Sequence, residues 1–266
     1  MRIGLVTLCA LRGQRDRNIE KILSFARDAA DQGCQLVLFP EYSVHGPWVT
    51  YDPESELADL REQSEPIPGQ STDRLTTAAR DMGLALGVGL AERGLSRKPF
   101  NTYVIITGDG VAHVQRKLQP TESEMAYYRG GGDALETFKL QGRSFGVTIC
   151  ADNESPAIHD GLRARGAEVI IEPHYDCTKT FQNPGDSWEE ILEFNRIGTL
   201  RRRAEDLSRR LGVIALYIDA KDPRDGFAER PEWVHYVNGK SAAFGSDGNL
   251  LAENAGNQES LLVVDV

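Results

Sequence analysis

Three apolar, strand-like stretches of the sequence each end at one residue that could take part in catalysis. Glu41, Lys117 and Cys150 close the stretches 35–40, 111–116 and 142–149. Cysteine attacks as a thiolate but is mostly protonated at neutral pH, so it needs a base or a positive charge nearby. A carboxylate can act as that base, and a fixed ammonium can stabilise an oxyanion. The three residue types therefore predict a hydrolytic site with Cys150 as the nucleophile.

The segment that follows Cys150 favours this interpretation. Five residues later, Ser155-Pro156 suits the first turn of a helix. The exposed amides and the partial positive end of that helix would favour a thiolate. The backbone amide of Ala151 would bind an oxyanion together with Lys117. The sequence also leaves open a plainer interpretation, in which Cys150 is a buried structural cysteine at the end of a strand.

Two carboxylates could belong to the site, and Glu41 is the candidate for the base. Glu41 follows four apolar residues and Pro40. A carboxylate in apolar surroundings has a raised proton affinity. Glu124 lies in the segment 121–125, in a loop or a short helix. Each of these carboxylates, like Lys117, has an alternative interpretation as a solvated residue at the surface.

Helical and strand-like segments alternate along the chain, which predicts a layered α/β architecture. Buried strands such as 36–39 and 169–171 need cover on both faces, and two sheets packed back to back with helices outside would supply it. The segment 41–69 contains four prolines and is expected to be a long irregular loop, of a kind that is often functional. Other strands are expected at 3–8, 84–90, 102–107, 111–116, 135–140, 144–149, 213–218 and in the C-terminal tail, and helices at 17–31, 71–82 with Ser71 as N-cap, 156–166 and 188–211.

The composition limits the class of protein and its partners. The chain has 266 residues, 40% of them hydrophobic and 26% charged, which is ordinary for a soluble globular protein. Its formal charge of −10 argues against nucleic acid or an anionic membrane as the main partner, because phosphate binding needs a basic surface. No signal peptide and no apolar run of membrane-spanning length is visible, so a cytoplasmic protein is expected. The four cysteines form no C-x-x-C pair, which argues against a zinc or redox motif.

Three blocks of sequence resemble the signature blocks of the nitrilase superfamily of carbon–nitrogen hydrolases, in the same order and at similar spacing. They are Phe39-Pro40-Glu41, then Arg116–Thr121 with Glu124 downstream, and Gly146–Asp152. The resemblance covers nearly the whole chain. The segments 3–8, 101–102, 201–206 and 239–248 are similar to the first strand, a strand start, a helix and the C-terminal tail of that family.

The resemblance implies a fold, a catalytic centre and an assembly. The fold would be a four-layer αββα sandwich with two mixed sheets, formed by residues 1–266 as a single carbon–nitrogen hydrolase domain. Glu41, Lys117 and Cys150 would be the catalytic triad, with Glu124 as the additional glutamate found near it. Members of the family need no metal or organic cofactor and are typically homo-oligomers, so we expect a homodimer or a higher homo-oligomer.

The reaction that the resemblance implies is cleavage of a non-peptide C–N bond in a small amide or carbamoyl compound through a cysteine thioester. Cys150-Ala151-Asp152 is similar to the Cys-x-Asp of amide-cleaving members. The loop after Lys117 is closer to the nitrilase form, so conversion of a nitrile to acid and ammonia stays open. We expect the substrate to be bound by Ala151, Tyr42, His174 and Tyr175.

Other classes of function remain open. A nitrilase-like binding or regulatory protein without turnover would keep the same fold, but it need not contain one thiol that reacts much faster than the others with iodoacetamide. Acyl transfer to an amine in place of water is a variant of the same chemistry. A nucleotide-binding α/β protein is disfavoured, because neither G-x-G-x-x-G nor G-x-x-x-x-G-K-[ST] follows a strand.

Overall fold

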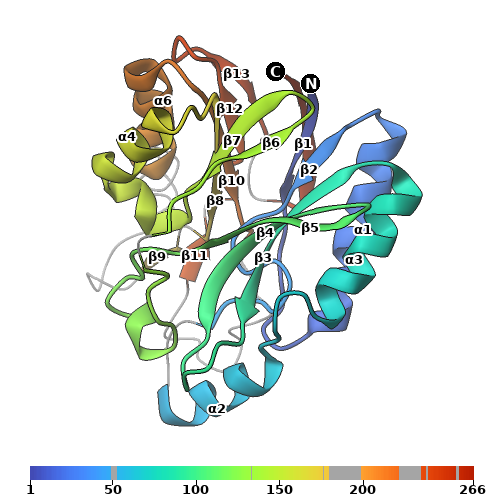
Figure 1. Cartoon of the computed structure of the whole chain (residues 1–266), viewed down its shortest axis with the longest axis vertical. Coiled ribbons are helices and arrows are strands. Elements are labelled where there is room, and N and C mark those ends of the chain that lie inside the picture. The colour runs from blue at the N-terminus through green and yellow to red at the C-terminus, as the bar shows by residue number, and fades with distance from the viewer. Residues whose placement is uncertain are drawn as a thin grey trace, which may run out of the picture.

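Two six-stranded β-sheets packed face to face form the centre of the protein, and helices cover their outer faces (Figure 1). The computed structural model describes residues 1–48, 53–132, 134–175, 177–179, 199–221, 235–237, 239–255 and 258–266. The first strand pairs with the last, with Arg2 opposite Asp265, so the two termini lie side by side. The arrangement confirms the expected αββα sandwich.

The first sheet has the strand order β14-β1-β2-β3-β4-β5. Strands β1, β2 and β3 are parallel, whereas β14, β4 and β5 run antiparallel to their neighbours, so the sheet is mixed. The Asp109-Gly110 turn joins β4 to β5, and Thr107 pairs with Gly110. The strands are β1 (Arg2–Thr7), β2 (Leu36–Leu38), β3 (Ala85–Glu92), β4 (Phe100–Thr107), β5 (Gly110–Arg116) and β14 (Ser260–Asp265).

The second sheet has the order β13-β12-β10-β8-β7-β6 and is also mixed. Its central strands β10, β8 and β7 are parallel, and the outer strands are antiparallel. The strands are β6 (Phe138–Leu140), β7 (Arg143–Val147), β8 (Val169–His174), β10 (Ile214–Asp219), β12 (Ala242–Phe244) and β13 (Leu250–Glu253). A small separate pair consists of β9 (Cys177–Lys179) and β11 (His235–Val237).

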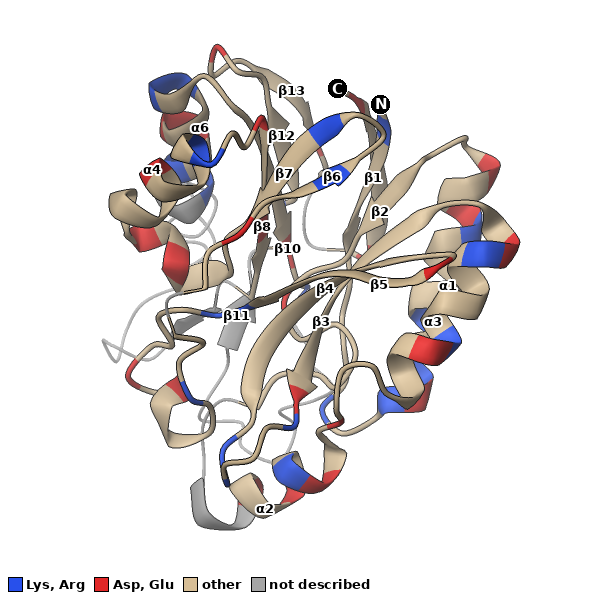
Figure 2. Cartoon of the chain, in the orientation of Figure 1, with Lys and Arg blue, Asp and Glu red and all other residues tan. Residues whose placement is uncertain are grey.

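The alternation of side chains along the strands explains the layers. In β2, Leu36 and Leu38 point into the core between the sheets, while Val37 packs under the outer helices of the first sheet. This follows from the two-residue period of a strand, and both faces are apolar because both are covered. Helices α1 (Arg15–Asp31) and α3 (Gln70–Met82) cover the first sheet, and α4 (Pro156–Ala164) and α6 (Thr199–Leu211) cover the second. Charged residues are frequent along these helices and few lie on the strands (Figure 2).

Several expected elements differ from the structure. The segment 41–69 is not wholly irregular, because it contains helix α2 (Pro53–Gln63). Its proline stands in the first turn, where the missing N–H costs nothing. Helix α3 begins at Gln70 with Gly69 as N-cap, so Ser71 lies inside the helix. The strand expected from residue 135 begins at Phe138, and residues 188–198 of the expected long helix lie outside the described residues.

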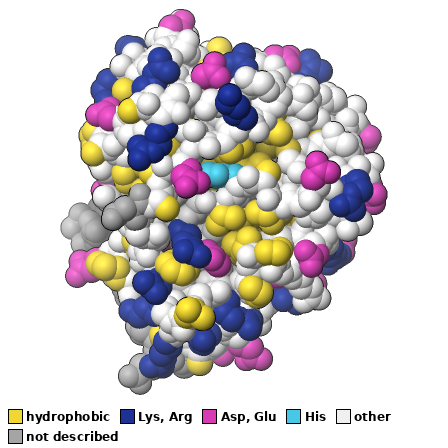
Figure 3. All heavy atoms as spheres, viewed as in Figure 1, with side chains coloured by type: hydrophobic (Ala, Val, Ile, Leu, Met, Phe, Trp, Pro, Cys, Tyr) yellow, Lys and Arg dark blue, Asp and Glu magenta, His cyan; other side chains and the backbone are white. Residues whose placement is uncertain are grey.

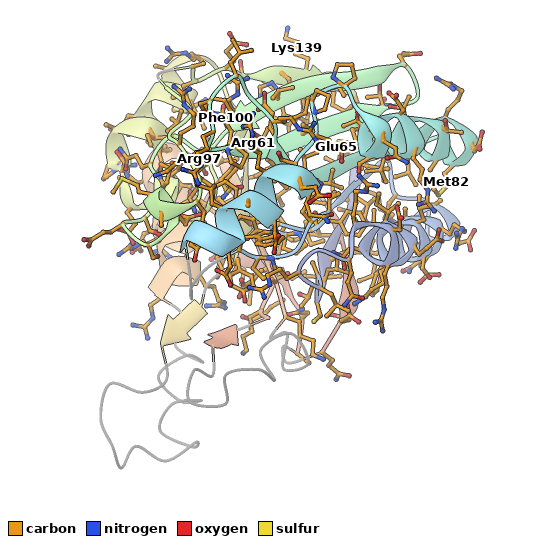
Figure 4. All side chains as sticks on the ribbon, turned by 90° about the horizontal axis from the view of Figure 1, so that it is seen from below. Arg61, Glu65, Met82, Arg97, Phe100 and Lys139 are labelled. Carbon is orange, nitrogen blue, oxygen red and sulfur yellow. The ribbon has the colours of Figure 1, made fainter. Side chains whose placement is uncertain are left out.

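Helix α2 lies at the end of the first sheet where β3 ends. Its Leu60 packs in one cluster with Ala91 of β3 and with Tyr42. In Figure 4, seen from below, α2 crosses in front of the sheets, and Arg61 lies near Arg97 and Phe100. Arg61 Nη1 donates a hydrogen bond to the Arg97 carbonyl at 3.1 Å, which ties α2 to the loop between β3 and β4.

The surface differs in character across the face seen in Figure 3. Hydrophobic side chains gather in its middle, around the seam between the two sheets, and charged side chains are spread over the rest. Among the helices in the described part of the chain, none has the length and apolar character needed to cross a membrane.

Candidate active site

The structure brings the four predicted catalytic residues to the ends of strands from both sheets. Glu41 follows β2 by three residues, and Lys117 directly follows β5. Cys150 opens the short 3-10 helix η2 (Cys150–Glu154), just beyond β7. Glu124 begins a second 3-10 helix, η1 (Glu124–Ala126). Glu41, Lys117 and Glu124 are each at most 3% exposed, so this centre is screened from bulk water.

The backbone around Glu41 lies against strand β3. A Cβ atom at Gly89 would lie 2.6 Å from the Tyr42 nitrogen and 3.1 Å from the Glu41 Cα, so a glycine is required for this approach. Tyr42 itself has a left-handed backbone, with φ at 59°. Ser43 Oγ accepts the Gly89 N–H at 2.9 Å, and Gly89 accepts the Val44 N–H at 2.9 Å. These contacts fix the turn that carries Glu41.

Lys117 joins the two carboxylates of the centre. Its Nζ lies 2.8 Å from Glu41 Oε1 and 2.8 Å from both oxygens of Glu124. Asn101 is the second residue of β4. Its Nδ2 donates to Glu41 Oε1 at 2.6 Å and to Glu124 Oε1 at 3.3 Å. One ammonium and one carboxamide therefore hold both carboxylates in place.

Three further groups donate hydrogen bonds to the carboxylates of Glu41 and Glu124. The Tyr175 N–H donates to the second oxygen of Glu41 at 3.0 Å. The Thr121 N–H donates to Glu124 at 2.8 Å, and the Tyr42 hydroxyl donates to the other Glu124 oxygen. Buried ions are tolerated only when they are paired and hydrogen-bonded, and both carboxylates satisfy this condition.

The environment sets the protonation states of the three groups. Burial raises the pKa of Glu41 to about 7; the Lys117 ammonium opposes this shift and the Glu124 carboxylate adds to it. Burial would also raise the pKa of Glu124, but Lys117 and the hydrogen bonds from Tyr42 and Thr121 outweigh it and hold that pKa below its usual value. Burial disfavours the Lys117 ammonium, yet Glu124 and Glu41 keep its pKa well above the ordinary range. The centre thus contains a fixed cation, a fixed carboxylate, and a second carboxylate poised near neutral pH.

Cys150 lies in a strained turn that is tied to the loop of Lys117. Its φ is 47°, in the left-handed region that a residue with a Cβ seldom occupies. The Asp152 carboxylate accepts N–H groups from Leu118 at 3.1 Å, Gln119 at 2.8 Å and Ile149 at 3.2 Å. Asp152 therefore braces the Cys150 turn against the residues next to Lys117. The charge of Cys150 also contributes to the raised pKa of Lys117, which agrees with their proximity.

The residues expected to bind the substrate lie in two different places. The ring of Tyr42 stacks on Tyr128 with centroids 5.7 Å apart and meets the edge of Tyr175 at 5.9 Å, beside the carboxylates. Ala151 is half-buried in η2, next to Cys150. His174 is fully buried elsewhere, with its ring 4.5 Å from that of Tyr217 on the outer face of the second sheet. Asn153, 3.1 Å away, joins it to the Cys150 turn.

Sequence reasoning missed several members of this centre. Asn101 stood out only as part of a strand motif, and Asp152 only as part of the block around Cys150. The Tyr175 N–H could not be foreseen at Glu41, because a backbone donor leaves no trace in residue type. Among the described residues, no group of three or more His, Cys, Asp or Glu side chains is arranged to hold a metal ion.

Comparison with known proteins agrees with this geometry. Residues 2–196 match the family described as Carbon-nitrogen hydrolase. The chain is 29% identical over 203 residues to an aliphatic nitrilase from Sinorhizobium fredii (strain HH103), covering 72% of this chain and 63% of that protein. It is 30% identical over 171 residues to an (R)-stereoselective amidase from Pseudomonas sp, covering 64% of this chain and 59% of that protein. The chain thus spans about three fifths of the length of these two relatives.

The fold is also similar to that of solved structures. An amidase from Nesterenkonia sp. superposes with a TM-score of 0.78 at 25% sequence identity. The superposition covers 100% of this chain and 90% of that chain.

Proposed function

Because the chain belongs to the carbon–nitrogen hydrolase family, we propose that it hydrolyses a non-peptide C–N bond of a small amide or carbamoyl compound, with Cys150 as the nucleophile. The observation that supports this most is the buried Glu41–Lys117–Glu124 centre, with its 2.8 Å contacts, beside the strained Cys150 turn. The reaction would release ammonia or an amine and a carboxylic acid.

In the first half of the proposed reaction, Glu41 removes the proton from the Cys150 thiol. A base whose pKa is near the working pH is well suited to this step, and the pKa of Glu41 is raised to about 7. The thiolate forms a C–S bond with the carbonyl carbon, and the negative charge moves to the carbonyl oxygen. Lys117 and the Ala151 amide stabilise that oxyanion.

Collapse of this intermediate breaks the C–N bond. The leaving nitrogen takes the proton that Glu41 received, and Glu124 assists by hydrogen bonding. A thioester on Cys150 remains. Water then attacks the thioester while Glu41 accepts its proton, and the C–S bond breaks to release the acid. The thiolate recovers its proton from Glu41, so water and amide are converted to acid and amine with no net change in the protein.

A nitrile substrate is the second candidate, favoured by the similarity to an aliphatic nitrilase and by the Pro120-Thr121 loop after Lys117. A nitrile-cleaving enzyme would use the same thiolate attack and would need two waters to reach the acid. A binding protein that uses this site without turnover is the third. The contacts among Glu41, Lys117 and Glu124 beside the Cys150 turn support an enzyme over a binding protein.

A hydrolysis screen over small amides, carbamoyl amino acids and nitriles tests the proposal. The expected result is turnover of an amide or carbamoyl compound that Cys150→Ala abolishes while the fold survives. Cys34→Ala is the matched control, because Cys34 is buried in the core under α1. Turnover that survives in Cys150→Ala would refute the proposed mechanism, and turnover of nitriles alone would select the second candidate.

The remaining proposals concern the whole chain. Residues 1–266 form one domain, supported by the pairing of the first strand with the last. The protein is a homodimer or a higher homo-oligomer in the cytoplasm, and small amides are its partners, with neither nucleic acid nor membrane. It works without a metal or an organic cofactor, since the proposed reaction needs only the side chains described above.

A further inference from the structure

The Cys150 turn is held from behind by a second side chain, that of Asn153. Asp152 points toward the Lys117 loop, whereas Asn153, the next residue, points the other way, under the outer helices of the second sheet. The turn needs such support, because the left-handed backbone of Cys150 is strained and persists only where the surrounding structure holds it.

Asn153 uses all of its hydrogen-bonding capacity within this turn and its neighbours. Its Oδ1 accepts the Thr148 hydroxyl at 2.6 Å and lies 2.9 Å from His159 Nε2. Its Nδ2 donates to the Thr148 carbonyl at 3.3 Å and lies 3.1 Å from His174 Nε2. One carboxamide thus joins the end of β7, the first turns of α4 and the end of β8. All four residues are buried.

The two histidines are neutral, which fixes the direction of each hydrogen bond. Burial lowers the pKa of His159 to about 4; Arg210 adds to the shift and Asp160 opposes it. Burial also holds the pKa of His174 well below its ordinary value, with contributions from Lys117, Arg203 and His159. His159 therefore donates from Nε2 to Asn153 Oδ1, and His174 Nε2 accepts from Asn153 Nδ2.

Charged groups surround this network without entering it. Arg203 of α6 pairs with Glu154 at 3.2 Å, and Arg210 of α6 pairs with Asp160 of α4. The carboxyl group of Glu172, whose pKa burial raises to about 8, lies 3.9 Å from His174 Nε2 on the same face of β8 and is protonated at neutral pH. The hydrogen bonds of Asn153 themselves are all between neutral groups, so they persist across the pH range in which Glu41 titrates.

We propose that Asn153, held by Thr148 and His159, is a positioning residue that keeps the Cys150 sulfur directed toward Lys117 and Glu41. The inference deepens the proposed function, on which its catalytic consequence rests. Loss of one donor to Oδ1 would let the turn relax toward an unstrained backbone and would move the sulfur. A displacement of about 1 Å at a reacting atom can cost on the order of 10²-fold in rate, so even a partial shift is measurable.

A pair of substitutions at His159 separates the effect of its hydrogen bond to Asn153 from the effect of its side-chain volume. His159→Gln keeps an amide donor at the reach of Nε2, whereas His159→Leu keeps the volume and removes the donor. We expect His159→Leu to lower kcat about tenfold with KM within about twofold, which corresponds to the loss of one neutral hydrogen bond. The second-order rate of Cys150 alkylation by iodoacetamide should fall in parallel. His159→Gln should stay within about threefold of wild type in both measurements.

Thr148 supplies an independent pair, which decides the question if His159→Leu does not fold. Thr148→Val is isosteric and removes the hydroxyl that donates to Asn153, and Thr148→Ser retains it. His113→Leu is the matched control. His113 lies on the edge strand β5, is buried against the ring of Phe138, and has no hydrogen bond to this network among the described residues. It should leave kcat and the alkylation rate unchanged when activity is expressed per folded protein.

The outcomes are distinct. Equal rates in the donor-retaining and donor-lacking variants, whether both high or both low, would overturn the inference, and so would a loss confined to KM. Failure of the wild-type protein to turn over any amide or nitrile would remove the proposed function. The alkylation comparison would still test the positioning of Cys150 in that case, because it requires no turnover.

Discussion

Replacing Glu172 by glutamine should make the stability of the protein less sensitive to pH. Glu172 lies in β8 with no exposed surface, and neither of its oxygens has a hydrogen-bond partner among the described residues. Within the described part of the chain, the nearest basic atom is His174 Nε2 at 3.9 Å, and that histidine is neutral. Burial alone raises the pKa of Glu172 from 4.5 to about 8. The folded protein therefore keeps a proton there that the unfolded chain releases.

The sign and the size of the effect follow from linkage. Between pH 4.5 and pH 8 the folded state binds one more proton at this site than the unfolded state, so stability falls as pH rises. The slope is about 1.4 kcal/mol per pH unit, which accumulates to at most about 5 kcal/mol over that interval. Glutamine has nearly the shape of the protonated acid but does not titrate, so this part of the pH dependence disappears.

Urea unfolding of wild type and Glu172→Gln at several pH values from 5 to 8.5 measures the difference directly. All other titrating groups, including Glu41, are shared and cancel. The variant should gain stability relative to wild type as pH rises, by about 2 kcal/mol or more between pH 5.5 and pH 8. Glu122→Gln, at an exposed loop position, controls for loss of a charge alone. Stability curves that run parallel within about 0.5 kcal/mol would refute the claim that Glu172 is buried as a neutral acid.

Three further predictions concern the proposed catalytic centre. Because Glu41 must be ionised to act as a base, kcat/KM should rise with pH through about 7. Glu41→Gln should lower kcat by about 10²–10⁴-fold. A pH profile of kcat/KM that does not rise near pH 7 would exclude Glu41 as the base. Lys117→Ala should lower kcat by about 10²–10³-fold with little change in KM, and an effect on KM alone would remove its oxyanion role. Gly89→Ala should lower kcat, and it should lower the free energy of unfolding by about 1–3 kcal/mol. The reason is that the added Cβ would lie 2.6 Å from the Tyr42 nitrogen. An unchanged kcat would show that this contact does not position Glu41.

Much of the fold could be predicted because local sequence and tertiary structure agree. Strand β2 is a short apolar run because both of its faces are covered. Strand β5 could be predicted because it follows the Asp109-Gly110 turn, a strong hairpin signal. Helix α2 was missed because four prolines in 41–69 were read together as helix breakers. Only one of them lies in the helix, in its first turn, where proline is tolerated.

The site could be predicted only in part. Glu41, Lys117 and Cys150 could be found because each stands alone at the end of a strand-like stretch. The hydrogen bond from Tyr175 N–H to Glu41 joins residues 134 positions apart, and it depends on how the two sheets pack. His174 was expected in the substrate pocket because Glu172-Pro173-His174 follows the predicted strand 169–171, where the similar family has smaller residues. The two-residue period of β8 instead places its side chain with Ile170 and Glu172, on the face covered by α4 and α6.

The most direct test of the proposed mechanism is the mass of the protein during turnover. Wild type mixed with an amide substrate and quenched rapidly in acid should carry one acyl group, and peptide mapping should place it on Cys150 as a thioester. Glu41→Gln should accumulate little of this species from an amide, because proton transfer from the thiol and to the leaving nitrogen is impaired. An acyl group on another residue, or full turnover with no acyl group on Cys150 under any quench, would contradict the account.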